Sequence, residues 1–331
     1  MRKLKKITKK WIFIGSAVVT VVMLAIILPF SHLGAQQGEG SSGEVTIEGV
    51  IYKPESGKMF VAGATKEVAT IASIANKLPV GGILPNALKN NTVTKTVQFK
   101  GDFSEFIFCS SAFENSQVTK LLDIPAASLF DAGALRLMPD LTQITALQSD
   151  TVFVQSGILY IKNDTVTTLV KVPTNMTTLP ANYAKNVAVI ATGAFDYSRV
   201  SVVDIPSNVL RLESAVFSNS GVNRIILRRK TTVLPADVIA PLTKELVVLV
   251  DAKDQASFKE YYNGGAVFLR KYGLYMHPLS DGYDTAGKVH CVGSHISIAG
   301  YVYTKNKDGQ TITVDLGGGT KLTNVDAWYI L

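Results

Sequence analysis

The stretch AFDYSRVSVVDIP at residues 194–206 contains the unit from which most of this chain is built. A small residue and an aromatic one come first, a short polar run follows, and an apolar burst ends in Asp-Ile-Pro. A hydrophobic pair stands in the same local setting five times: Ala112-Phe113, Ala134-Leu135, Ala194-Phe195, Val216-Phe217 and Val238-Ile239. The first two pairs are 22 residues apart, and so are consecutive members of the last three. This period predicts a solenoid, in which each short unit buries its apolar face by stacking on its neighbours.

An apolar burst follows four of the pairs after about ten residues. The bursts occupy residues 121–125, 202–206, 225–227 and 246–250. Each is short, rich in aliphatic residues and bounded by proline or polar residues, which predicts a buried strand. The predicted unit is therefore a strand, a turn, a loop or short helical turn that carries the pair, and a second strand.

A longer repetition lies over the short one. Residues 49–61 match residues 157–173, and each stretch predicts a β-hairpin around a polar turn. Downstream, residues 84–90 match residues 179–186. The matched positions are 108, then 95, then 82 residues apart, the last value being the separation of the two aromatic anchors. We expect two related arms of one solenoid, with more insertions in the first.

The pattern Ala-Phe, about ten residues, Asp-Ile-Pro and a further anchor, interrupted by a Gly-Ile-Leu-Tyr hairpin, resembles the BspA-type leucine-rich repeats of bacterial surface proteins. The resemblance covers roughly residues 49–275 and is clearest from Ser156 to Val250. It implies a right-handed α/β solenoid, rich in short strands that line one face. It also implies a surface protein that acts in adhesion or recognition.

The charge of the chain is concentrated at its N-terminus. The formal net charge is +7, but six of the 33 cations lie within residues 2–10, which leaves 27 cations against 26 acids downstream. Nucleic-acid binding requires a basic stripe on the folded part, and only Arg228-Arg229-Lys230 forms a basic run there. We interpret that run as the solvated edge of a repeat, and we expect no nucleic-acid partner.

An uncharged segment follows the basic cluster. Residues 11–30 contain no charge and would form a helix about 30 Å long, which matches the hydrocarbon thickness of a bilayer. The cations before it place the N-terminus in the cytoplasm and the rest of the chain outside. The segment is either a retained signal anchor or a cleaved signal peptide, so the chain is expected in the cell membrane as a single-pass protein or secreted.

Four regions follow from these features. We expect a basic tail with the signal segment at 1–30, a Gly/Ser linker at 31–43, the solenoid at 44–280 and a small β module or cap at 281–331. In the last region, alternating apolar and polar residues flank Asp308-Gly309, which predicts a β-hairpin. A terminal unit of this kind would cover the exposed core at the end of a solenoid.

Candidate metal ligands and thiols are few. His277, His290, Cys291 and His295 lie close in sequence, but no acidic cluster or second cysteine lies near to complete a four-ligand site. We therefore predict no metal and no cofactor. Cys109 lies in an apolar run, far in sequence from Cys291, and we expect two free thiols rather than a disulfide.

Catalytic motifs are also missing from the sequence. The glycine run at 317–319 lacks the order of a phosphate-binding loop, and no nucleophile elbow, dinucleotide fingerprint or zincin motif occurs. Asp123 and Asp204 stand in matching Asp-Ile-Pro positions, so we interpret them as turn or edge residues of the repeat rather than paired catalytic carboxylates. We predict no catalytic residue, and the ligand-binding residues stay unassigned.

Two functions are compatible with this sequence. The first is a non-catalytic cell-surface protein that binds a protein or glycan ligand through the solenoid face, since repeats offer a wide surface. The second is a cell-envelope enzyme or enzyme-accessory protein, whose C-terminal β module carries the chemistry or docks to the cell wall. We favour the first.

Overall fold

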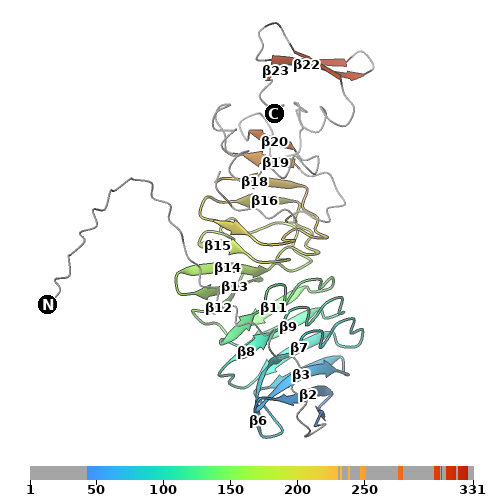
Figure 1. Ribbon diagram of the computed structural model, residues 1–331, viewed down its shortest axis with the longest axis vertical. Coiled ribbons are helices and arrows are strands. Elements are labelled where there is room, and N and C mark those ends of the chain that lie inside the picture. The colour runs from blue at the N-terminus through green and yellow to red at the C-terminus, as the bar shows by residue number, and fades with distance from the viewer. Residues whose placement is uncertain are drawn as a thin grey trace, which may run out of the picture. The chain divides into compact units, whose positions relative to one another are not determined.

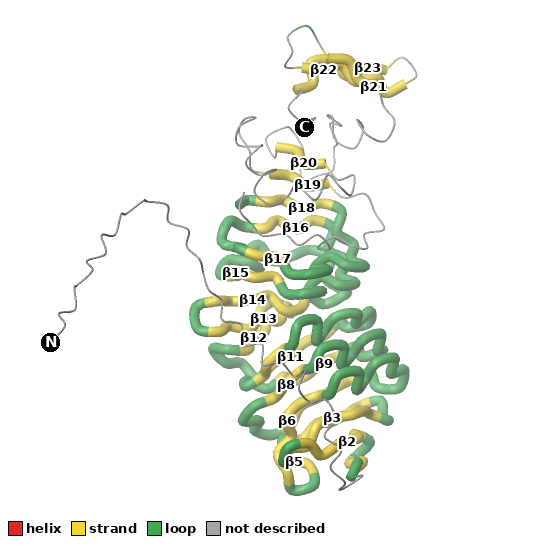
Figure 2. The backbone as a smooth tube through the Cα atoms, in the orientation of Figure 1, coloured by secondary structure: helices red, strands yellow, loops and turns green. Residues whose placement is uncertain are grey.

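The computed structural model describes residues 43–229, Thr232, Val238 and Lys307, together with the backbone of five more strands near the C-terminus. The chain divides into two compact units, Met1–Ser42 and Gly43–Leu331, and the signal segment expected at 11–30 lies outside the described residues. The described residues contain strands, turns and loops but no helix (Figure 2). Of the loop or short helical turn expected to carry each pair, the described residues show the loop, so the expected α/β class is corrected to all-β for this part of the chain.

The strands of the described part of the chain form five sheets, and many of these strands are labelled in Figure 1. Sheet A1 contains β1 (Val45–Ile47), β2 (Val50–Glu55), β3 (Lys58–Ala64), β5 (Ile74–Ala75), β6 (Leu78–Ile83), β8 (Phe106–Phe108) and β10 (Ser128–Phe130). Sheet B1 contains β4 (Val68–Ala72), β7 (Thr96–Lys100), β9 (Lys120–Ile124) and β11 (Gln143–Ala146). Sheet A2 contains β12 (Val152–Gln155), β13 (Ile158–Asn163), β14 (Val166–Lys171), β15 (Val187–Ile190) and β17 (Arg211–Leu212). Sheet B2 contains β16 (Val202–Ile205), β18 (Arg224–Leu227), β19 (Val247–Val250) and β20 (Tyr275–Pro278), and the last sheet contains β21 (Val302–Lys305), β22 (Thr311–Gly317) and β23 (Thr320–Asp326).

In the first arm, from β3 to β11, the chain passes between sheets A1 and B1 once per repeat. Strands of successive turns pair in parallel, with Phe106 opposite Ser128 in A1 and Val202 opposite Arg224 in B2. Both pairs are 22 residues apart, so the solenoid predicted from the sequence period is confirmed. The strands form two sheets in each arm, rather than lining one face as expected.

The hydrophobic pairs lie in loops that share one backbone signature. Positive φ angles occur at the residue before each pair and at the residue three positions after its first member, namely Asn86/Asn90, Ser111/Asn115, Gly133/Leu137, Gly193/Tyr197 and Ala215/Asn219. These loops stack on one another, because the amide of Leu88 donates to the carbonyl of Ala112 at 2.8 Å. Ala87-Leu88 is therefore a further copy of the hydrophobic pair, which lacks the aromatic residue and was not predicted.

Each arm begins with the same three-stranded meander. The turns at Glu48-Gly49 and Ser156-Gly157 both have two positive φ angles, which is the geometry of a type I′ hairpin turn. The hairpins β2–β3 and β13–β14 predicted from the longer repetition are present. In both meanders the third strand then starts the parallel ladder, as β3–β6–β8 in A1 and β14–β15–β17 in A2.

The correspondence between the arms differs from the expected one. Ile83 corresponds to Ile190, 107 positions later, and Phe113 corresponds to Phe217, 104 positions later, so the separation is nearly constant. The predicted match of residues 84–90 with residues 179–186 is wrong. The first stretch lies in a pair-bearing loop, whereas the second precedes β15 and has none of the positive φ angles of those loops.

The buried side chains form two hydrophobic cores, one in each arm. The meander β12–β14 lies between them and supplies residues to both. Its Val152, Leu159 and Val170 pack in the first core, while Ile158, Tyr160 and Leu169 pack in the second. Because side chains alternate along a strand, one meander can cover two cores with its two faces.

Candidate functional site

One turn of the second arm lacks a strand on its B side. In the first arm β4 lies between β3 and β6, but in the second arm the chain between β14 and β15 forms no strand. We call residues 172–186 the gap segment. Sheet B2 therefore begins with β16, although β14 and β15 are direct neighbours in A2.

The first strand of B2 has an open edge. In a parallel strand, the N–H and C=O of one residue point to the same neighbouring strand, and the next residue points to the opposite side. The carbonyls of Ser201 and Ile205 accept hydrogen bonds from the amides of Arg224, in β18, and of Arg228, directly after it. The backbone groups of Val202 and Asp204 consequently point away from β18, toward the gap segment.

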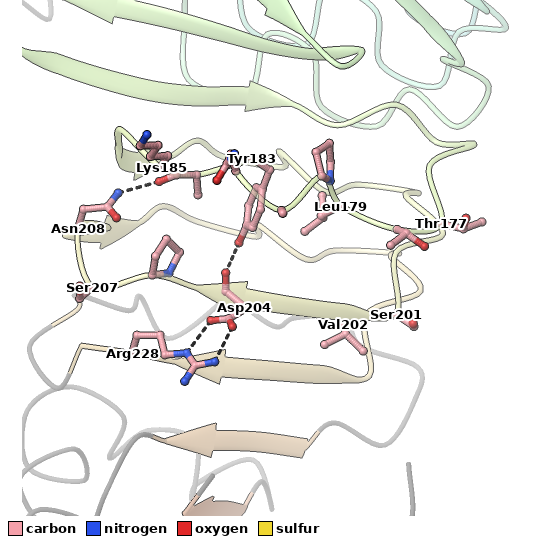
Figure 3. Close-up of a pocket in the computed structure, with 16 residues that line it drawn as sticks. Thr177, Leu179, Tyr183, Lys185, Ser201, Val202, Asp204, Ser207, Asn208 and Arg228 are labelled. Atoms are coloured by element: carbon pink, nitrogen blue, oxygen red, sulfur yellow. Dashed lines mark hydrogen bonds and ion pairs between the residues drawn. The ribbon is translucent and has the colours of Figure 1, made fainter. Parts of the chain in front are cut away.

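The gap segment is tied to β16 near one end. The Tyr183 hydroxyl donates to the carbonyl of Asp204 at 2.6 Å (Figure 3). The Asn208 amide donates to the carbonyls of Ala184 and Val187 at 2.7 Å. The buried Tyr160 hydroxyl in turn donates to the Tyr183 carbonyl at 2.7 Å. Burial raises the pKa of both tyrosine hydroxyls, so they stay protonated donors at physiological pH.

Two grooves flank the gap segment. One, of about 770 Å³, lies between the gap segment and β16, and Thr177, Thr178 and Val202 are among the residues that line it (Figure 3). We call it the β16 groove. The other, of about 1000 Å³, lies on the side of the meander, with Phe153 and Lys162 in its wall. Both volumes lie in the range of sites that bind small ligands.

An ion pair crosses the wall of the β16 groove. The Arg228 guanidinium binds the Asp204 carboxylate with two hydrogen bonds of 2.9 and 2.7 Å, and both side chains are partly exposed. Arg229 donates to the carbonyl of Ser207 at 3.3 Å. Two members of the basic run thus contact the preceding turn of the solenoid, while Lys230 lies outside the described residues.

The two Asp-Ile-Pro aspartates occupy the same repeat position in different sheets. Asp123 lies in β9 of B1, where its side chain accepts from Gln98 at 3.1 Å and its amide donates to Thr145 at 2.8 Å. Asp204 lies in β16 of B2, where its carboxylate accepts from Arg228 of the next turn and its carbonyl accepts from the Tyr183 hydroxyl. Each aspartate links adjacent repeats, as expected for repeat-specific edge residues, and the two do not form a carboxylate pair.

Of the cysteines and the candidate metal ligands, the structure describes Cys109 and His277. Cys109 is a buried free cysteine, and burial raises its pKa to about 11, so it stays a neutral thiol. His277 lies in β20, whereas His290, Cys291 and His295 lie outside the described residues. Within the described part of the chain, no three His, Cys, Asp or Glu residues are grouped to hold a metal ion, and no helix is long and apolar enough to cross a membrane.

Neither the gap segment nor the open edge of β16 was predicted from the sequence. A signal was available, because residues 172–186 contain no apolar burst where the repeat requires one. Two prolines and several polar residues replace it. Matching this stretch to residues 84–90 by residue identity concealed the missing strand.

The comparisons with known proteins concern the fold. No family model and no curated protein sequence matches this chain. Bacterial leucine-rich repeat proteins are among the solved structures that it resembles. A leucine-rich cell surface protein from Faecalibacterium prausnitzii is 13% identical, with a TM-score of 0.24 over 67% of this chain and 98% of that one. A leucine-rich repeat protein from Eubacterium ventriosum is 12% identical, with a TM-score of 0.35 over 62% of this chain and 77% of that one.

A third match is the pneumococcal vaccine antigen PcpA, at 9% identity and a TM-score of 0.23 over 67% of this chain and 96% of that one. The kind of protein found agrees with the resemblance expected from the repeat pattern. At identities of 9 to 14%, these matches are a likeness of fold and not of function.

Proposed function

We propose that this chain is an exported, non-catalytic cell-surface protein that recognises a protein or glycan ligand through the outward side chains of its solenoid. The observation that carries the proposal is a row of side chains across sheet B1. Val68, Thr96, Lys120 and Gln143 are register partners in four successive strands, and each is exposed or half-exposed. Because each turn contributes one residue, the face combines contacts from four repeats on a rigid support.

The basic cluster and the uncharged segment at 11–30 support display outside the cell. The Gly/Ser linker at 31–43 supports a tether that holds the solenoid away from the membrane. In this proposal the signal segment either anchors the chain as a single-pass membrane protein or is removed on secretion. Protease shaving of intact cells tests the display: we expect release of solenoid fragments, and full protection in intact cells would contradict it.

Recognition is tested with purified residues 36–331. We expect saturable binding to at least one member of a panel of cells, extracellular matrix proteins and glycans. Absence of saturable binding across the whole panel would contradict the proposal.

A further inference from the structure

We propose that the open edge of β16 is a docking site for an extended polypeptide segment, which joins sheet B2 as a strand parallel to β16. This inference rests on the proposed function and narrows its ligand at this site to a peptide. The gap segment, the β16 groove and the edge of β16 together form the site.

The edge of β16 presents backbone N–H and C=O groups that an added strand could pair with. Ser201 and Ile205 use their carbonyls toward β18, so Val202 presents an N–H and a C=O on the other side and Asp204 presents an N–H two residues later. Among the described residues, only the Asp204 carbonyl on this side has a partner, the Tyr183 hydroxyl. Donors and acceptors repeated every second residue are the pattern to which an extended peptide adds by main-chain hydrogen bonds.

The space beside the edge corresponds to a missing strand. In A2, β14 and β15 are directly paired strands, so this turn of the solenoid advances the stack by one strand spacing of about 4.8 Å. The same turn provides no strand in B2, and the β16 groove of about 770 Å³ lies there instead. Tyr183 and Asn208 hold the gap segment at one end of the groove, while Thr177 and Thr178 line it without a hydrogen bond to β16 among the described contacts (Figure 3).

The wall of the groove limits the side chains of the peptide. Met176 and Leu179 of the gap segment already pack against the second core. An incoming strand therefore has room only for small residues, such as glycine, alanine or serine, at the positions that face inward. The Asp204 carboxylate is neutralised by Arg228, and Lys185 adds a cation to the lining, so we expect an acidic residue at one outward position.

The site is tested with a phage-displayed library of random linear 12-residue peptides, selected against the full-length protein. We expect enriched peptides with alternating small residues and one acidic residue. Val202→Pro removes the free edge N–H and leaves the bonds of Val203 and Ile205 to β18 in place. Thr178→Trp fills the groove from an exposed position, and Thr92→Trp places the same side chain at an exposed position of the first arm.

We expect Val202→Pro and Thr178→Trp to weaken peptide binding at least tenfold and Thr92→Trp to leave it unchanged. In the bound state, amide hydrogen exchange at Val202 and Asp204 slows at least tenfold, while Val203 and Ile205 are already protected in the free protein. Peptides that bind Thr178→Trp as tightly as the unaltered protein, or no change in exchange at Val202 and Asp204, would overturn the inference. If no peptide is enriched while the panel ligand still binds Thr178→Trp, the docking site is wrong and the proposed function stands; if neither binds, both fail.

Discussion

The Lys171 ammonium donates to the backbone carbonyl of Asp196 at 3.2 Å, and both residues are fully buried. Lys171 also donates to the carbonyl of Gly193 at 3.3 Å. The Asp196 carboxylate accepts from the amide of Leu137 at 3.0 Å and lies 3.8 Å from the Arg136 guanidinium, both in the first arm. The junction of the two arms therefore contains two buried charges, Lys171 and Asp196, held by backbone groups and by the partly exposed Arg136. Burial raises the pKa of Asp196, and the neighbouring Lys171 opposes that shift.

The stability of the protein should depend on the charge of Lys171. Burial lowers the pKa of this ammonium from 10.5 to about 8. Below pH 8 it is protonated in both the folded and the unfolded chain, whereas between about 8 and 10.5 only the unfolded chain binds the proton. The contribution of Lys171 to the free energy of unfolding therefore rises with pH in this window, by about 1 kcal/mol at pH 9 relative to pH 7. Urea denaturation at the two pH values measures the change.

Lys171→Met is the control for this dependence. It removes the titrating group, so the gain between pH 7 and pH 9 should disappear. A gain of equal size in the variant would show that other groups cause it.

The positive φ angle before each hydrophobic pair restricts substitution at Gly193. A Cβ atom there would lie 2.7 Å from the Arg136 Cγ and 2.8 Å from the Asp196 Oδ2, at φ +65°. Gly193→Ala should lower the free energy of unfolding by about 3 kcal/mol, of which about 1 kcal/mol is backbone strain. Gly57→Ala is the matched control, because Gly57 has φ +77° but no atom within 4 Å of the added Cβ. Equal losses in the two variants would mean that the crowding at the junction contributes nothing.

The aromatic anchors should carry much of the core stability. Phe217 is fully buried in the second core, and its ring centroid lies 5.3 Å from that of Phe195. Phe217→Ala should cost about 3–5 kcal/mol in thermal or chemical denaturation. Phe217→Leu should cost clearly less, because Leu135 occupies the same repeat position in the first arm. A leucine variant as unstable as the alanine variant would contradict the equivalence of these positions.

The Tyr183 hydroxyl should fix the gap segment against β16. Tyr183→Phe removes its donor to the Asp204 carbonyl and should lower the free energy of unfolding by about 1 kcal/mol. Because burial raises the pKa of this hydroxyl, the difference between the variant and the unaltered protein should stay constant from pH 6 to pH 9. A difference that vanishes within this range would mean that the hydroxyl titrates there.

Much of the repeat could be predicted because it depends on side-chain burial. The four apolar bursts correspond to β9, β16, β18 and β19, and the predicted hairpins are the pairs β2–β3 and β13–β14. Burial requires apolar residues at fixed intervals, and such intervals are visible in a sequence.

The correspondence of the arms could not be predicted in the same way. It depends on backbone angles at residues such as Asn86, Ala215 and Tyr197, which share φ near +50 to +60° but no residue type. Residue identity therefore led to the wrong match of residues 84–90 with 179–186. The open edge of β16 was also hidden, because it consists of backbone groups that every residue has.

The central claim, recognition through the outward row of sheet B1, is tested most directly by one binding measurement. The dissociation constant of residues 36–331 for the ligand found in the panel is compared between Lys120→Glu and Lys77→Glu. Both lysines are exposed, but only Lys120 lies in the row, between Thr96 and Gln143. We predict at least tenfold weaker binding for Lys120→Glu and unchanged binding for Lys77→Glu. Equal dissociation constants for the two variants and the unaltered protein would contradict the account.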